Sequence, residues 1–269
     1  MGDSLLGRRA ISHREYVILL AYRFIIFHME SYLYDDLYQL EETHWWHRNK
    51  RRLVISLLSH FFPKEKIRIV DIGCGTGKNV EAFSRFGQCW GLDMSDRAIA
   101  YCKKRGLGHI RKGRAEKTGL SDNYFDAVTL LDVLEHTDDT KTIWEMHRIL
   151  KNNGLIFITV PAYRWMWSRW DEVLHHKRRY GKADLENILQ HNGFRIRKFS
   201  FIYAFLLVPA LIIRYIKSRH AGGSYGSDFQ LSNPFLNRVL LAVCRIESWC
   251  ILYGSVPFGT SILCVAEKI

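Results

Sequence analysis

The segment from Val70 to Asn79 constrains the fold of this chain more than any other. The β-branched residues from Ile67 to Val70 predict a buried parallel strand, and glycine then recurs at alternate positions before a helix begins. Glycine allows a tight turn with positive φ and lets a ligand lie against the main chain and the helix N-terminus. Asp93, at the end of the next predicted strand, is placed to accept hydrogen bonds from two ribose hydroxyls. Together they predict a nucleotide-binding loop.

The glycine spacing and the preceding acid distinguish this loop from a dinucleotide site. Gly73, Gly75 and Gly77 are spaced G-x-G-x-G, whereas a dinucleotide fingerprint is spaced G-x-G-x-x-G and receives a pyrophosphate. Asp71 would repel a pyrophosphate but suits a ligand with positive charge, such as the ammonium and sulfonium of S-adenosylmethionine. A glycine-rich turn that binds no ligand is the alternative.

The run from Val70 to Gly77 resembles the first motif of class I S-adenosylmethionine-dependent methyltransferases. The resemblance covers about residues 29–269 and extends to bacterial methyltransferases described only by type, on the segments 42–48, 163–168 and 176–180. The family has an adenine-binding turn after the third strand, where Arg114 here replaces the usual aspartate. The resemblance implies S-adenosylmethionine as cofactor, bound by Asp71, Gly73, Gly75, Gly77, Asp93, Met94, Ala115, Glu116 and Leu131.

Strands alternate with helices of about ten residues along the chain, which predicts an α/β fold with a doubly wound, Rossmann-like parallel sheet. Strands are expected at 67–71, 88–92, 109–112, 125–131, 154–160 and 194–203, and helices at 31–58, 78–86, 95–105, 139–151 and 182–191. The resemblance implies a mostly parallel seven-stranded sheet whose last strand, 261–266, pairs antiparallel beside the 194–203 strand.

A long insertion separates the last two predicted strands, where the family has a short hairpin. We predict a helical insertion at 205–259 within a methyltransferase domain at 29–269, an N-terminal extension at 1–28, and translation from Met1 or Met29. The uncharged stretch 199–213 contains Pro209 and, at fifteen residues, is shorter than the roughly twenty that span a bilayer. Arg214, Lys217 and Arg219 follow it, as in a segment lying in a membrane interface. A lid over the active site or a dimer seam is a compatible alternative.

Charge and cysteine content narrow the partners and the compartment. Lys and Arg number 39 against 27 Asp and Glu, a net charge of +12, which favours anionic partners: phosphorylated acceptors, nucleic acid or an acidic membrane leaflet. No base-flipping motif or recognisable RNA-binding domain accompanies that charge, which counts against nucleic acid. Six cysteines without C-x-x-C or zinc spacing indicate reduced thiols in a cytoplasmic protein, with a peripheral position at the inner membrane face compatible.

The fourth predicted strand ends in a reactive cluster. Asp132, Glu135 and His136 resemble the Glu-x-x-Glu-His of ubiquinone-biosynthesis O-methyltransferases, in which those side chains are associated with a divalent metal, although Asp replaces the first Glu here. These three side chains could hold Mg²⁺ or Zn²⁺, or His136 could be a general base for an acceptor hydroxyl. Glu135 and His136 could instead only cap or orient the next helix.

The loop after the fifth predicted strand carries the predicted acceptor site, because loops at strand ends hold the variable chemistry of such folds. Its aromatic side chains could line the site of an apolar or ring-bearing acceptor, and its basic run could bind a phosphate or carboxylate. A solvated basic face is the alternative. The expected catalytic residue here is Tyr163, and the expected acceptor-binding residues are Trp165, Trp167, His176, Lys177, Arg178 and Arg179.

The leading functional hypothesis is methyl transfer from S-adenosylmethionine to an oxygen of a small or lipid-linked anionic acceptor at a membrane surface. Positioning supplies much of the rate of such an in-line displacement, and a base is needed only where the acceptor loses a proton. A catalytically silent cofactor-binding module at a membrane is one alternative, and a nucleic-acid methyltransferase is another.

Overall fold

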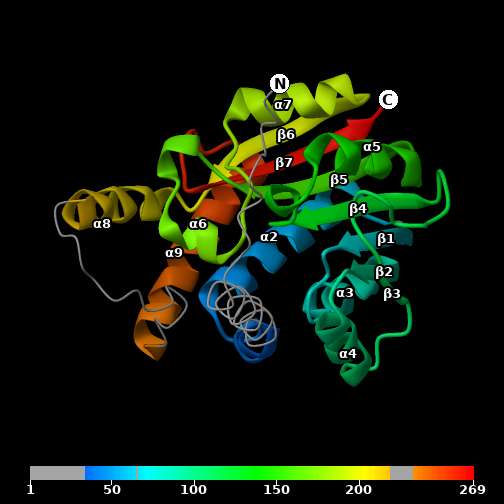
Figure 1. The fold of residues 1–269 in the computed structure, drawn as a ribbon, viewed down its shortest axis with the longest axis horizontal. Coiled ribbons are helices and arrows are strands. Elements are labelled where there is room, and N and C mark those ends of the chain that lie inside the picture. The colour runs from blue at the N-terminus through cyan, green and yellow to red at the C-terminus, as the bar shows by residue number, and fades with distance from the viewer. Residues whose placement is uncertain (1–33, 65, 219–232) are drawn as a thin grey trace, which may run out of the picture.

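A seven-stranded sheet in the order β3-β2-β1-β4-β5-β7-β6 organises the protein (Figure 1). The computed structural model describes residues 34–64, 66–218 and 233–269. Only β7 is antiparallel to its neighbours, and it pairs with β5 on one side and β6 on the other. The predicted fold class, including the antiparallel last strand, is confirmed. The strands are β1 (Ile67–Ile72), β2 (Gly87–Asp93), β3 (Ile110–Lys112), β4 (Phe125–Leu131), β5 (Leu150–Pro161), β6 (Phe194–Ile202) and β7 (Ser261–Lys268).

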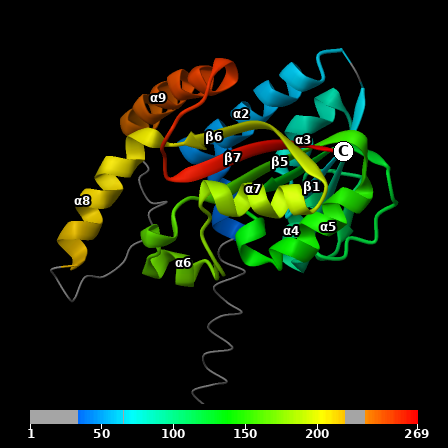
Figure 2. The ribbon, with the colours of Figure 1, turned by 90° about the horizontal axis from the view of Figure 1, so that it is seen from above.

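Helices cover both faces of the sheet (Figures 1 and 2). In β1, Ile67 and Ile69 belong to the apolar cluster that includes residues of α2, α3, α4 and α9, whereas Val70 and Ile72 belong to the one that includes residues of α5 and α7. This alternation explains the continuous apolar run of the sequence, because both faces of a parallel strand are buried. The helices are α2 (Trp45–Phe61), α3 (Lys78–Phe83), α4 (Asp96–Lys104), α5 (Asp139–Ile149), α6 (Arg169–Val173), α7 (Lys182–His191), α8 (Leu207–Ser218) and α9 (Pro234–Tyr253).

The helix expected at 31–58 is interrupted in the structure. Residues 34–40 are helical, a turn follows, and α2 begins at Trp45 with His44 as its N-cap. The chain turns where Glu41 points inward and accepts hydrogen bonds from Thr76 and Arg105. A buried side chain with partners elsewhere in the fold therefore ends the first helix, which periodicity along the chain could not indicate.

The segment between β6 and β7 contains α8 and α9, in agreement with the expected helical insertion. Glu247 of α9 holds this segment to the sheet, since its carboxylate accepts hydrogen bonds from the backbone N–H groups of Tyr203 and Ala204, both at 2.7 Å. None of the helices in the described ranges is long and apolar enough to span a bilayer. The proposed extension at 1–28 lies outside the described residues, and the predicted domain boundaries stay a prediction.

Replacing Glu247 with alanine should destabilise the fold by about 2–4 kcal/mol, because two buried N–H groups lose a carboxylate acceptor. The measurement is urea unfolding at pH 7 followed by circular dichroism. Glu186→Ala is the matched control, because Glu186 makes only a 3.9 Å ion pair with the exposed Lys182 and should change stability by less than about 0.5 kcal/mol. Equal effects of the two substitutions would contradict the assigned role of Glu247.

Candidate active site

The glycine loop joins β1 to α3 at the carboxyl edge of the sheet. Gly73, Gly75 and Gly77 have φ of 69°, 55° and 87°, all in the left-handed region. A Cβ on Gly77 would lie 2.5 Å from the Leu107 side chain, so packing also requires glycine there. The Gly73 N–H donates to the Leu92 carbonyl at 2.7 Å, which fixes the loop against the end of β2.

Asp93 links this loop to α4. One of its carboxylate oxygens accepts from the Gly75 N–H and the other from the Ser95 N–H, each at 2.9 Å. Burial raises the pKa of Asp93, and these backbone hydrogen bonds partly offset that rise. The Tyr34 hydroxyl also donates to this carboxylate, at 3.5 Å. The predicted ribose contact would therefore share the carboxylate's roughly four lone-pair sites with these protein donors.

Asp71 lies beneath the loop rather than on its surface. The side chain is buried and accepts a hydrogen bond from Thr129. Burial raises the pKa of Asp71 to about 7, against the lowering effect of the Thr129 hydrogen bond. Its expected contact with a cationic cofactor stays a prediction, whereas its observed contact is the hydrogen bond from Thr129 of β4.

Glu41 joins the segment before α2 to the glycine loop, a contact that the sequence did not predict. Its carboxylate accepts hydrogen bonds from Thr76 in the loop and from Arg105 after α4. Arg105 also donates to the Thr76 carbonyl at 3.0 Å. The segment before α2 is therefore held against the glycine loop.

The expected adenine-binding turn lies beside the glycine loop, because the Gly113 N–H donates to the Asp93 carbonyl at 3.0 Å. Arg114, at the position where the family usually has aspartate, is 65% exposed and lies 3.5 Å from Glu116. Ala115 is buried. The remaining expected contacts are the exposed Met94 and the half-buried Leu131, whose cofactor roles stay predictions.

Glu135, His136 and His176 converge after β4. Each offers one potential ligand atom, and these three atoms lie within 4.8 Å of one another. Glu135 is 1% exposed, and neither of its carboxylate oxygens accepts a hydrogen bond from another described residue. Burial raises the pKa of Glu135 to about 8, with Lys50 and Arg179 opposing the rise, and burial lowers the pKa of His136 to about 4.

His176 is oriented by Asp171. The Nδ1 atom of His176 lies 2.9 Å from Asp171 Oδ1, and Nε2 lies 4.0 Å from Glu135 Oε1. Although burial opposes it, hydrogen bonds from His176 and Arg179 hold the pKa of Asp171 well below its usual range. The arrangement therefore directs the free nitrogen of the imidazole toward Glu135. The sequence contains one signal for a structural role of Asp171, because the Ser168-x-x-Asp171 spacing is typical of a helix capping pair.

Asp132 does not join this cluster, which corrects the expected metal-ligand set. Its carboxylate forms an ion pair with the buried Lys50 and accepts a hydrogen bond from Thr159 at 2.7 Å. Its backbone is in the left-handed region, with φ of 57°. Lys50 comes from α2, far away in sequence, so its proximity to Asp132 could not be inferred from local spacing.

The acceptor loop is arranged differently from the sequence expectation. Arg178 pairs with Asp139 and Arg179 pairs with Asp171, so both guanidinium groups already contact a carboxylate within the protein. Both arginines therefore stabilise the loop through these ion pairs, whereas the Lys177 side chain is exposed to solvent. The aromatic expectation is closer to the structure, because Tyr163 stacks between Trp165 and Phe201, with centroid distances of 5.2 Å on both sides. Trp167 is 39% exposed.

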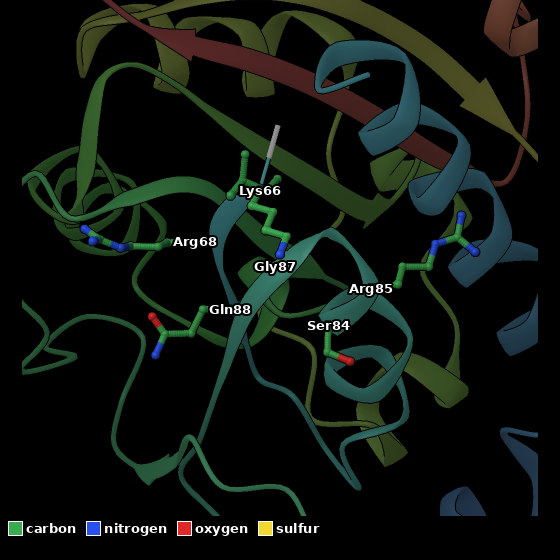
Figure 3. A pocket seen from close by; sticks show the side chains of 7 residues that line it. Lys66, Arg68, Ser84, Arg85, Gly87 and Gln88 are labelled. Atoms are coloured by element: carbon green, nitrogen blue, oxygen red, sulfur yellow. The ribbon is translucent and has the colours of Figure 1, made fainter. Parts of the chain in front are cut away.

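A separate hollow lies at the opposite edge of the sheet (Figure 3). Ile67 and Gly87, the first residues of β1 and β2, belong to its lining, together with Lys66, Arg68 and Arg85. The glycine loop and the Glu135 cluster follow the other ends of the strands. The hollow is therefore not part of the candidate active site.

Comparison with known proteins identifies a methyltransferase domain in part of the chain. A family model described as a methyltransferase domain matches residues 70–158. An uncharacterised methyltransferase of Bacillus subtilis, YcgJ, is 32% identical over 120 residues, covering 42% of this chain and 47% of that protein. A ubiquinone biosynthesis O-methyltransferase of Xanthomonas oryzae pv. oryzae is 32% identical over 104 residues, covering 34% and 42%. This chain therefore covers less than half of the length of either relative.

A solved structure supports the same fold. Phosphoethanolamine N-methyltransferase 2 of Haemonchus contortus, in complex with S-adenosylmethionine, superimposes with a TM-score of 0.52 at 19% identity, covering 83% of this chain and 52% of that chain. The family model begins at Val70 and so includes the whole glycine loop. The sheet order, the loop and the matched residues agree, and they identify residues 70–158 as a class I S-adenosylmethionine-dependent methyltransferase domain.

Proposed function

We propose that the protein transfers the methyl group of S-adenosylmethionine to an oxygen of a small or lipid-linked anionic acceptor at a membrane surface. The observation that carries the proposal is the position of the Glu135 and His176 side chains at the same sheet edge as the glycine loop. A methyl donor held on that loop would face a buried carboxyl and an oriented imidazole. Such a pair suits an acceptor that must lose a proton.

The reaction is an in-line displacement at the sulfonium. The acceptor oxygen attacks the methyl carbon, the carbon–sulfur bond breaks with its electron pair on sulfur, and S-adenosylhomocysteine leaves. The hydroxyl proton passes to Nε2 of His176, which lies 4.0 Å from Glu135 Oε1. Positioning of donor and acceptor supplies most of the rate.

His176 is the better placed of the two histidines to take that proton. Asp171 fixes the orientation of the His176 ring, because its carboxylate lies 2.9 Å from Nδ1. His136, by contrast, has its pKa lowered to about 4 by burial and next by His176, which disfavours a proton on its ring. We therefore assign the proton acceptor to His176, next to Glu135, and a supporting position to His136, the base expected from the sequence.

The same three side chains fit a divalent metal as well. Glu135, His136 and His176 form a two-histidine, one-carboxylate set, and the unpartnered buried carboxylate is the observation that supports this fit. A metal held there would polarise the acceptor oxygen as a Lewis acid. Lys50 and Arg179 already place two positive charges near Glu135, which favours the metal-free assignment.

The side chains on the surface of the acceptor loop support one chemical class of acceptor. The stacked rings of Tyr163 and Trp165 offer an apolar contact, and Lys177 offers an exposed positive charge. These features support an acceptor with an apolar or ring-bearing part and an anionic group. A cytoplasmic location with contact to the inner membrane face remains part of the proposal.

Asp93→Asn should weaken S-adenosylmethionine binding by about tenfold or more, because an amide cannot accept at both positions that the carboxylate serves. Isothermal titration calorimetry with S-adenosylmethionine measures the affinity directly. Asp96→Asn is the control, since Asp96 lies at the start of α4 and pairs only with the exposed Lys112. Failure of the unmodified protein to bind the cofactor would defeat the proposed function.

Glu135→Gln should change how stability depends on pH. Because the folded state raises the pKa of Glu135 from 4.5 to about 8, folded protein retains a proton that the unfolded chain loses, so stability falls as pH rises between these values. The variant lacks this contribution and should gain about 2–4 kcal/mol relative to the unmodified protein between pH 5 and 8. Urea unfolding across that pH range measures it, with the exposed Glu172→Gln as control.

Chelation separates the metal-free mechanism from its alternative. Labelling of a bacterial lipid extract by S-adenosylmethionine with a radioactive methyl group should continue unchanged after dialysis against EDTA. The control is Asp93→Asn, which should lose labelling with or without EDTA. Loss of labelling after dialysis, with recovery on addition of Zn²⁺ or Mg²⁺, would assign the Glu135 cluster to a metal.

A further inference from the structure

An apolar stripe runs along the exposed face of α9. Large apolar side chains recur at intervals of three, four or seven residues, so they lie on one side of the helix. Their exposed fractions range from 42% for Val239 to 79% for Tyr253. We call this set the α9 stripe: Phe235, Val239, Ile246, Trp249 and Tyr253.

The stripe is not the face with which α9 joins the fold. Cys244, Glu247 and Ile251 lie on the opposite side of the helix and are buried, and α9 packs there against α2 (Figure 2). The helix is thus apolar on both sides, and only one side has a partner in the described protein. A contiguous exposed apolar surface of this kind marks an interaction site.

Positive charge borders the stripe. Arg238 and Arg245 are exposed and directly precede Val239 and Ile246. Arg52 of α2 lies close to Arg245, and burial followed by the positive charge of Arg245 lowers the pKa of Arg52. No acidic residue of the described chain forms an ion pair with these three arginines. The only acid of α9 is the buried Glu247. A surface that is apolar at its centre and cationic at its border is complementary to anionic lipid.

The neighbouring helix extends this surface. Val208, Leu211 and Ile212 of α8 are exposed, and the sequence of α8 contains no acidic residue. In both views α8 projects away from the sheet on the side of α6 (Figures 1 and 2).

The two helices also leave the sheet at the edge of the active site. Ile202, the last residue of β6, pairs with Ser261, which in turn pairs with Pro161 at the end of β5. The acceptor loop begins directly after Pro161. At the other end of α9, Asn237 accepts from the Trp45 N–H and donates to the Thr43 carbonyl, next to the segment that contacts the glycine loop.

We propose that the α9 stripe, with the exposed residues of α8, docks the protein on an anionic phospholipid surface and turns the carboxyl edge of the sheet toward that surface. The inference rests on the proposed function in one respect: docking would bring a lipid-linked acceptor to the site. The α9 stripe enters the interface between headgroups and acyl chains, and Arg238 and Arg245 contact the headgroups.

The test is flotation of the full chain with vesicles of phosphatidylglycerol and phosphatidylcholine, compared with vesicles of phosphatidylcholine alone. The unmodified protein should float with the anionic vesicles and much less with the neutral ones. Ile246→Glu with Trp249→Glu should lower the vesicle partition coefficient by about tenfold or more, because two apolar anchors are lost and two negative charges are added. Trp144→Glu is the matched control, because Trp144 is 60% exposed on α5, away from the stripe.

Several results would overturn the proposal. Flotation that is equal for the double variant and the Trp144→Glu control would remove the stripe from the contact. Absence of vesicle binding, together with a dimer in light scattering that the double variant converts to a monomer, would assign the stripe to a second copy of the chain. Calorimetry with S-adenosylmethionine keeps the two proposals apart: a folded double variant should bind the cofactor normally, so lost flotation with intact cofactor binding tests docking alone.

Discussion

The parallel direction of β1, β2, β4 and β5 brings the functional segments of this protein together. Because these strands end at one edge of the sheet, the glycine loop, Asp93, the Glu135 cluster and the acceptor loop all emerge there, although they are spread over about a hundred residues of sequence. The buried strands tolerate little change, whereas the loops can vary in chemistry. The predicted cofactor and acceptor sites are therefore neighbours because of the sheet topology, although their residues are far apart in the sequence.

The parts of the site that the sequence predicts well are local. The glycine spacing and the following acid are read within one β-loop-α unit, and the structure places both as expected. Contacts between distant segments were not predictable in the same way. Lys50 meets Asp132 only because α2 packs on the sheet, and Glu41 meets Thr76 only because the helix before α2 stops early. A single sequence contains the residues of such pairs but no signal that they meet.

The basic residues of the acceptor loop show that the number of charges in a segment does not indicate which of them are free to bind an anion. Read from the sequence, Arg178 and Arg179 suit a phosphate as well as a solvated surface. In the folded chain each faces a carboxylate, so their charges fix the loop and orient Asp171 and His176. Lys177, by contrast, is exposed in the same loop. The excess positive charge of the protein is more apparent at the border of α9, where arginines lack acidic partners among the described residues.

The left-handed backbone at Asp132 limits which residues evolution can place at that position. Asp and Asn adopt this conformation several-fold more often than most other residues, and glycine adopts it freely. A longer acid would gain reach toward the Glu135 cluster but lose the short geometry that joins Lys50 to Thr159. Substitution at 132 is thus restricted by the main chain before any ligand is considered, so Asp in place of the first Glu of the ubiquinone-type pattern has a conformational explanation that is independent of metal binding.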